Sequence, residues 1–169
     1  MDKKPKVAII MGSDSDLPIV SKTIKVLKEF NIEFEARVIS AHRTPDKASQ
    51  FAKEAENMGF DIIIAAAGKA AHLPGVLAAY TVVPVIGIPI KSSALYGMDA
   101  LLSIVQMPSG IPVATVGIDG AENAGLLAVE MLSIKYDYLR KTLKDRREKM
   151  AQEVSKKDEK VRMEEFNFD

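Results

Sequence analysis

KVAIIMGSDSDLPIVSKTIKVLKEF, residues Lys6 to Phe30, places a short apolar run directly before a helical pattern. The run from Lys6 to Met11 has the length and composition of a buried strand. From Leu17 onward apolar residues recur at helical spacing, and a proline stands near the helix start, where helices tolerate it. A strand followed at once by a helix is the repeating unit of α/β proteins.

The same alternation continues along the chain. Further strands are expected at 32–40, 61–67, 82–90 and 112–118, and helices at 17–30, 45–59, 71–81, 98–107 and 121–134. Strands made of near-continuous Val, Ile and Ala indicate a parallel sheet buried on both faces. We therefore predict an α/β fold: a three-layer αβα sandwich around a doubly wound parallel sheet with flavodoxin-like strand order.

Composition limits the classes of function. The chain has 169 residues, enough for one substantial core. Lys plus Arg and Asp plus Glu each number 23, so the net charge is zero, which argues against a nucleic-acid partner. Because there is no cysteine, disulfides, thiolate nucleophiles and cysteine metal sites are excluded.

The N-terminal residues pass from charge directly into the first apolar run without a small-residue cleavage site. The sequence also lacks a run of about 18 apolar residues, the length that a membrane-spanning helix needs. We expect a soluble, cytoplasmic protein with no membrane partner.

Charged residues dominate the sequence after Lys135. We divide the chain into a catalytic α/β domain, 1–135, and a charged helical extension, 136–169. A solvated helix with a frayed end is favoured over a regulatory tail. Tyr136, Leu139 and Leu143 are candidates to fix its first turns to the domain or to another subunit.

A doubly wound sheet binds its ligand outside the carboxyl ends of the strands. The residues that follow the first three strands are therefore the candidates for a site. Both histidines of the chain, His42 and His72, fall among them. The three segments are Gly12 to Asp16, Ser40 to Thr44, and Gly68 to His72.

The first segment, within MGSDSDLP, is too short for a dinucleotide motif and has no P-loop lysine. Its glycine, hydroxyls and backbone N–H groups at a helix start suit a single phosphate. Asp16 has the chemistry to accept hydrogen bonds from ribose hydroxyls. The alternative is that Ser15 or Asp16 only caps the helix.

In the second segment, SAHRTPD, ordinary helix-start chemistry explains Thr44 as a cap, Pro45 in the first turn and Asp46 near the helix dipole. It does not explain His42 or Arg43. An arginine at a helix start is unfavourable unless an anion lies there, and its planar fork suits phosphate. His42 near the same end is biased toward neutral imidazole, the form of a general base, although a structural histidine is the alternative.

The third segment, AAAGKAAHLPG, is dominated by small residues, which let the backbone approach a ligand and leave a dry cavity. His72 is either a turn residue bonded to the backbone or a ligand contact. The strand before this segment ends in alanine, so a phosphoaccepting receiver domain, which needs an aspartate there, is disfavoured.

Together, MGSDSD, SAHRTP, AAHLPG and SIVQMPSGIPVATV resemble the N5-carboxyaminoimidazole ribonucleotide mutase family of purine biosynthesis, the class I form of the phosphoribosylaminoimidazole carboxylase catalytic subunit. The resemblance covers Lys6 to Leu132. It implies an isomerase that moves CO2 from the exocyclic nitrogen to ring carbon 4 of an aminoimidazole ribonucleotide. It also implies a homo-octamer with sites at subunit junctions, and no ATP, metal, biotin or other cofactor.

The resemblance assigns His42 as the acid/base. The substrate-binding positions that it implies are Ser13, Ser15, Asp16, Ser40 and Arg43, together with Gly68, Lys69, Ala70, Ala71, His72 and Leu73 of the loop that covers the carboxylate. The family usually has glycine at the position of Lys69. Class II enzymes, which carboxylate aminoimidazole ribonucleotide directly with CO2, tend to have a basic residue there, but this chain keeps SAHRTP and AAHLPG in class I form.

The chemistry of the transfer requires one base near carbon 4, which matches His42. The carbamate loses CO2, carbon 4 recaptures it, and a proton must then leave that carbon. Three alternatives remain: direct carboxylation, a non-catalytic nucleotide-binding module that does not need His42, and a flavin carrier. The flavin carrier is disfavoured because there is no tryptophan and only Tyr80 and Tyr96 lie near loops.

Overall fold

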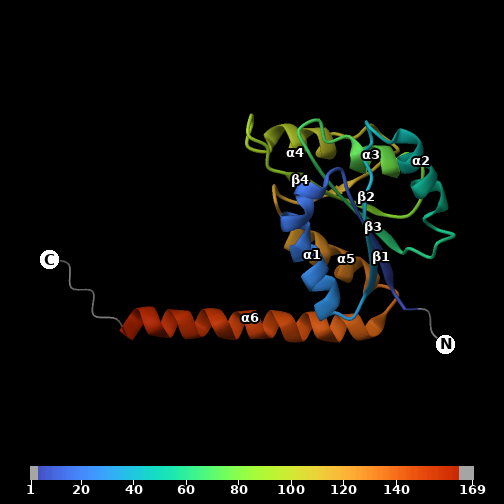
Figure 1. Ribbon diagram of the computed structural model, residues 1–169. Helices are drawn as coiled ribbons and strands as arrows, with labels where there is room; N and C mark the ends of the chain where they lie inside the picture. The colour runs from blue at the N-terminus through green and yellow to red at the C-terminus, as the bar shows by residue number, and fades with distance from the viewer. Residues whose placement is uncertain (1–3, 164–169) are drawn as a thin grey trace.

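Five parallel strands form one sheet in the order β2-β1-β3-β4-β5 in the computed structural model, which describes residues 4–163 (Figure 1). The strands are β1 (Lys6–Met11), β2 (Glu33–Val38), β3 (Ile62–Gly68), β4 (Val85–Ile90) and β5 (Ala114–Thr115). All four neighbouring pairs are parallel. This is the flavodoxin-like order, so the predicted doubly wound sheet is confirmed.

Helices cover both faces of the sheet. On one face lie α1 (Leu17–Glu29) and α5 (Ala121–Leu132), and on the other lie α2 (Pro45–Glu54), α3 (Leu73–Ala78) and α4 (Met98–Val105). Alternate residues of one strand serve the two faces: Ile62 and Ile64 pack with α1 and α5, whereas Ile63 packs with α2, α3 and α4. Because both faces are buried, every residue of such a strand is apolar, and the three-layer sandwich is confirmed.

Several elements are shorter than the sequence predicted, and for two of them the physical reason is clear. The helix expected at 45–59 ends at Glu54 and continues as turns to Gly59, whose φ of 81° is a left-handed conformation that ends a helix. The strand expected at 112–118 is reduced to Ala114–Thr115. This edge strand pairs only with β4, and Pro112 before it has no N–H to donate.

The charged extension forms α6 (Asp137–Met163), a helix of 27 residues that extends beyond the domain (Figure 1). Leu139 is fully buried and belongs to the core under α1 and α5, and Leu143 packs against the same core. The positions from Arg147 to Met163 are exposed, as expected of a solvated helix. The frayed end predicted for the chain falls at 164–169, outside the described residues.

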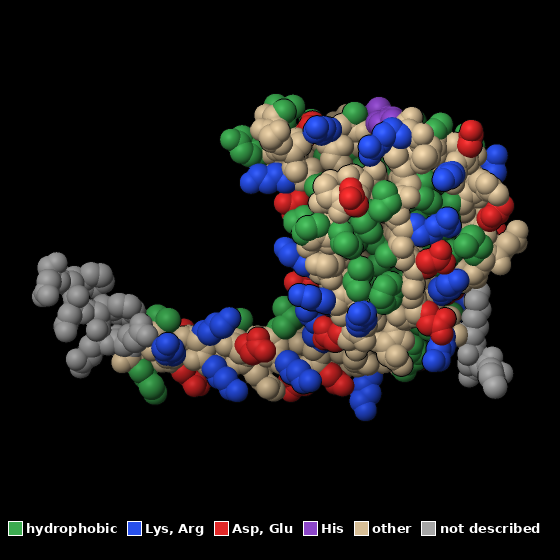
Figure 2. All heavy atoms as spheres, in the orientation of Figure 1, with side chains coloured by type: hydrophobic (Ala, Val, Ile, Leu, Met, Phe, Trp, Pro, Cys, Tyr) green, Lys and Arg blue, Asp and Glu red, His purple; other side chains and the backbone are tan. Residues whose placement is uncertain are grey.

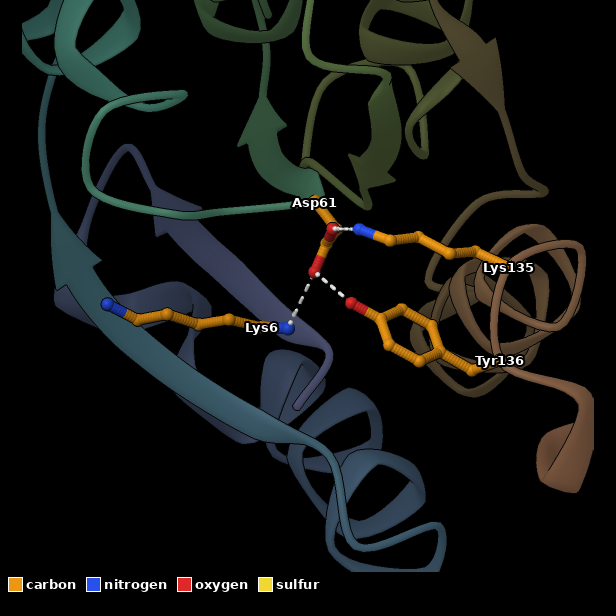
Figure 3. A network of polar contacts seen from close by, with 4 residues as sticks. All are labelled: Lys6, Asp61, Lys135 and Tyr136. Atoms are coloured by element: carbon orange, nitrogen blue, oxygen red, sulfur yellow. Dashed lines mark hydrogen bonds and ion pairs between the residues drawn. The ribbon is translucent and has the colours of Figure 1, made fainter. Parts of the chain in front are cut away.

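Asp61 ties the start of α6 to the sheet (Figure 3). Its Oδ1 accepts a hydrogen bond from Lys135 Nζ at 3.1 Å, and its Oδ2 accepts from Tyr136 Oη at 3.4 Å and from the Lys6 N–H at 3.1 Å. Arg146 adds ion pairs to Glu29 of α1 at 3.4 Å and to Glu122 of α5 at 2.8 Å. These contacts fix the direction of α6 at the edge of the sheet opposite to the carboxyl ends of the strands.

None of the helices within residues 4–163 combines the length and the apolar content needed to cross a membrane.

Candidate active site

A cavity of about 520 Å³ lies at the carboxyl edge of the sheet, where the loops after β1, β2, β3 and β4 meet. Figure 2 shows histidine side chains beside Lys and Arg side chains at this end of the molecule. The cavity is lined by Gly12, Ser13, Ser15, Asp16, Ser40, Ala41, His42, Arg43, Ala67, Gly68, Lys69, Ala70, His72, Leu73, Ile90, Lys91 and Ser92.

A larger hollow of about 690 Å³ lies at the opposite end of the sheet, near the residues that precede β4 and β5. Its only charged lining residues are Lys53 and Glu56, and it contains neither histidine. We place the candidate site in the smaller cavity because the acid/base and anion-binding groups gather there.

The loop after β1 is organised by Ser13. Its side chain caps the short 3-10 turn Asp14–Asp16 by accepting the Ser15 N–H at 3.3 Å, while Asp16 Oδ2 accepts the Ser13 N–H at 3.2 Å. Ser15 Oγ donates to Ser13 Oγ at 2.8 Å. Asp16 stands at the N-cap position of α1 but makes no capping bond to it, so neither Ser15 nor Asp16 caps that helix.

Asp16 is the carboxylate of the cavity, and its side chain is mostly buried. Burial raises the pKa of Asp16 above its ordinary value of 3.8, against the opposing effect of the hydrogen bonds from Ser13 and Ser15. The negative charge at this position is therefore less favourable than on an exposed aspartate.

The loop after β2 presents His42 and Arg43 to the cavity. The expected cap by Thr44 is wrong: its Oγ1 instead donates to the Ser40 carbonyl and accepts the Ser40 N–H, both at 3.0 Å. Ser40 Oγ accepts the Arg43 N–H at 3.2 Å. This closed turn leaves both the His42 and the Arg43 side chains exposed, and Arg43 Nη2 donates to the Gly12 carbonyl at 3.3 Å.

The two histidines contact each other across the cavity, although 30 positions separate them in the chain. His42 Nε2 lies 2.8 Å from His72 Nδ1, and the rings meet edge to face with centroids 4.9 Å apart. A hydrogen bond between two imidazoles needs one ring nitrogen as donor and the other as acceptor, so the two rings must present complementary nitrogens to each other. His72 is therefore more than a turn residue bonded to the backbone.

The loop after β3 has little room for side chains. A Cβ at Gly68 would lie 3.3 Å from the Ile90 carbonyl oxygen, so this position requires the close approach that glycine permits. Lys69 has a φ of 56°, a left-handed conformation that explains why glycine suits this position. Ala71 does not line the cavity: it is buried in the core packed against α2, α3 and α4.

Gly12 and Ala41 line the cavity from within two of the predicted segments, whereas four further lining residues were missed: Ala67, Ile90, Lys91 and Ser92. The last three could have been predicted from the sequence, because they end or follow the fourth strand. Ligands bind at the carboxyl ends of all strands of such a sheet, not only of the first three. Ser92 Oγ donates to Asp99 at 3.0 Å, and the Lys91 N–H donates to Asp119 Oδ1 at 2.9 Å.

Across residues 4–163, no three His, Asp or Glu side chains lie close enough together to hold a metal ion.

A family model described as AIR carboxylase matches residues 6–153 of the chain. The chain belongs to the AIR carboxylase family. This confirms the family resemblance that four short sequence motifs indicated, and the match extends past the midpoint of α6.

Individual members of the AIR carboxylase family match most of the chain. An N5-carboxyaminoimidazole ribonucleotide mutase from Pyrococcus abyssi is 64% identical over 146 residues, 86% of this chain and 84% of that protein. One from Pyrococcus horikoshii is 56% identical over 161 residues, 93% of this chain and 91% of that protein. The crystal structure of Treponema denticola PurE has a TM-score of 0.85 at 33% identity and covers 94% of this chain and 99% of its own.

The backbone at Lys69 generates a stability prediction. Lys69→Gly should leave the free energy of unfolding within about 1 kcal/mol of the parent, because relief of left-handed strain offsets the entropy of glycine. Lys69→Val should be less stable than Lys69→Gly by about 1–2 kcal/mol, because a β-branched residue disfavours this conformation. Chemical denaturation measures both, and equal stabilities of the two variants would contradict the backbone constraint.

Proposed function

We propose that this protein is an N5-carboxyaminoimidazole ribonucleotide mutase. It converts N5-carboxyaminoimidazole ribonucleotide to 4-carboxy-5-aminoimidazole ribonucleotide in de novo purine biosynthesis. The contact of His42 with His72, in a cavity that also holds Arg43, carries the proposal. The names of the Pyrococcus relatives support it.

The phosphate end of the substrate is assigned to the loops after β1 and β2. Arg43 supplies a planar cation that is already oriented toward the first loop by its bond to Gly12. Ser13, Ser15 and Ser40 add hydroxyls around the same part of the cavity. Asp16 is assigned to the ribose hydroxyls, which can donate to its oxygens.

His42 is assigned as the acid/base. Its Nε2 faces His72, which leaves Nδ1 for the substrate. When the carbamate N–C bond breaks, its electron pair returns to nitrogen, and His42 delivers a proton there. Carbon 4 then attacks CO2 to form the new C–C bond, and His42 takes the proton from carbon 4 so that the aromatic ring is restored.

His72 holds the imidazole of His42 in place during these transfers. Its Nδ1 lies within hydrogen-bond distance of Nε2, so the pair can share one proton and the orientation of the His42 ring is fixed. Precise placement of the base against the ring contributes to the rate because it removes the entropy of bringing the two groups together.

The loop after β3 is assigned to the retention of CO2. Ala67, Gly68, Ala70 and Leu73 give the cavity a small and mainly apolar wall on this side. A wall of this kind excludes water, so that CO2 released from nitrogen remains beside carbon 4.

The two other classes of function are less well supported. A nucleotide-binding module without catalysis has no need of two histidines in contact. A flavin carrier needs aromatic stacking at the site, but Tyr80 lines the hollow at the opposite edge of the sheet, and Tyr96 is not among the residues that line the cavity.

His42→Asn should abolish turnover and leave nucleotide binding nearly unchanged, because the proton transfer is removed and the phosphate contacts are kept. Arg43→Ala should instead weaken binding by about tenfold or more, since a charge-assisted hydrogen bond contributes roughly 1.5–3 kcal/mol. Absorbance assays of product formation and calorimetric titration measure the two effects. Turnover of His42→Asn within a few-fold of the parent would remove His42 from this role, and an unchanged affinity of Arg43→Ala would refute the phosphate assignment.

Direct carboxylation is the alternative to which Lys69 points, because a cation at the cavity wall can attract bicarbonate. Substrate with a labelled carboxylate, supplied in unlabelled bicarbonate buffer, should give labelled product, because CO2 is passed within the cavity. Mass spectrometry of the product measures retention, with subtraction of spontaneous decarboxylation in a sample without enzyme. Loss of most of the label during turnover would replace the mutase proposal with direct carboxylation.

The protein is further proposed to be a cytoplasmic homo-octamer with sites at subunit junctions, built from a catalytic domain at 1–135 and the extension at 136–169. The exposed apolar side chains on and before α4 support association with further copies. They are Leu95, Tyr96, Met98, Leu102 and Val105, each about half exposed or more. An apolar face of this kind is commonly covered by a copy of the same chain.

Leu102→Glu should dissociate the oligomer and reduce activity, because it places a charge in the apolar face of α4. Light scattering at micromolar concentration measures the mass of the parent and the variant, and product formation measures their activity. A parent that is monomeric and fully active under these conditions would contradict the proposal.

A further inference from the structure

Three cations and one carboxylate line the cavity: Arg43, Lys69, Lys91 and Asp16. Within the part of the chain that the structure describes, none of the three cations forms an ion pair with a carboxylate. Asp16 is the single carboxylate among these residues, so it can offset at most one of the three positive charges. The cavity is therefore suited to a ligand with more than one anionic group.

The cations stand at separate points of the sheet edge. Arg43 follows β2, Lys69 follows β3 and Lys91 follows β4, in a sheet whose order is β2-β1-β3-β4. Neighbouring strands are about 4.8 Å apart, so the ends of β2 and β4 are separated by about 14 Å. Arg43 and Lys91 therefore occupy opposite ends of the cavity, and two distant anionic groups of one ligand can reach one cation each.

The backbone of Lys91 is held firmly at this end. Its N–H donates to Asp119 Oδ1 at 2.9 Å, and the Asp119 N–H donates to the Pro89 carbonyl at 2.8 Å. The side chain is exposed, and its ammonium lies 5.4 Å from the centroid of the Tyr96 ring. Asp119 is engaged through the backbone of Lys91, so the ammonium remains available to an anionic ligand.

We propose that Lys91 binds the carboxylate of the carboxylated aminoimidazole ribonucleotides, opposite to the phosphate that Arg43 binds. This inference rests on the proposed function and adds a specificity residue to it. Lys91 distinguishes the carboxylated nucleotides from aminoimidazole ribonucleotide, which has the same phosphate and lacks the carboxylate. It takes no part in proton transfer, because His42 performs that step.

The test compares two ligands on the full chain. Calorimetric titration of Lys91→Gln should show about tenfold weaker binding of 4-carboxy-5-aminoimidazole ribonucleotide, and a change below twofold for aminoimidazole ribonucleotide. Arg43→Ala should weaken both ligands alike, because both have the phosphate. Lys91→Arg should retain most of the affinity for the carboxylated ligand, and Lys25→Gln on the exposed side of α1 is the matched control for loss of a lysine.

Kinetics provide a second readout. Lys91→Gln should raise KM for N5-carboxyaminoimidazole ribonucleotide by about tenfold and change kcat by less than threefold, a pattern that a folding defect does not produce. Unfolding curves that coincide with those of the parent establish that the variant is folded.

Two results would overturn this inference and leave the proposed function intact. In one, Lys91→Gln binds the carboxylated ligand as tightly as the parent does. In the other, it weakens both ligands equally, which would make Lys91 a general cation or a phosphate contact. A parent chain that binds neither nucleotide and forms no product would instead refute the proposed function, and this inference with it.

Discussion

Burial of parallel strands on both faces is the constraint on which this structure depends. The three inner strands β1, β3 and β4 supply apolar side chains to two helical layers, as Ile62 and Ile63 do from adjacent positions. A chain can join such strands only by passing over one face of the sheet and returning to its opposite edge. All loops that follow the strands therefore collect at the carboxyl edge, where they are free of the packing that fixes the core, and the polar groups of the chain can meet there.

The opposite edge fixes the rest of the chain. Asp61 joins the starts of β1 and β3 to the residues before α6 (Figure 3). Arg146 joins α6 to α1 and α5. Because the two edges are separated by the length of the strands, α6 is anchored without contact with the cavity. The residues at the amino ends of the strands therefore determine the direction of α6, and the loops at the carboxyl ends contain the candidate active site.

The cavity itself combines a rigid frame with exposed reactive groups. The turn closed by Ser40 and Thr44 and the left-handed Lys69 fix the backbone, whereas the rings of His42 and His72 meet between two separate loops. The positive charge around them is distributed along the edge rather than concentrated in one place. A ribonucleotide with a phosphate at one end and a carboxylate at the other matches this distribution of charge better than a single anion does.

The sequence by itself determined the alternation of strands and helices along the chain and the parallel sheet. It also determined the segments that contain His42, Arg43 and His72, because apolar periodicity and strand ends are local properties. Four short motifs were also enough to indicate the AIR carboxylase family. Only the tertiary structure decided that Glu54 ends α2, that Thr44 bonds back to Ser40 and that Ala71 packs in the core rather than facing the cavity. It also decided that His42 and His72 touch and that Lys91 joins their cavity, because these contacts depend on which strands become neighbours in the sheet, and no local pattern of residues contains that information.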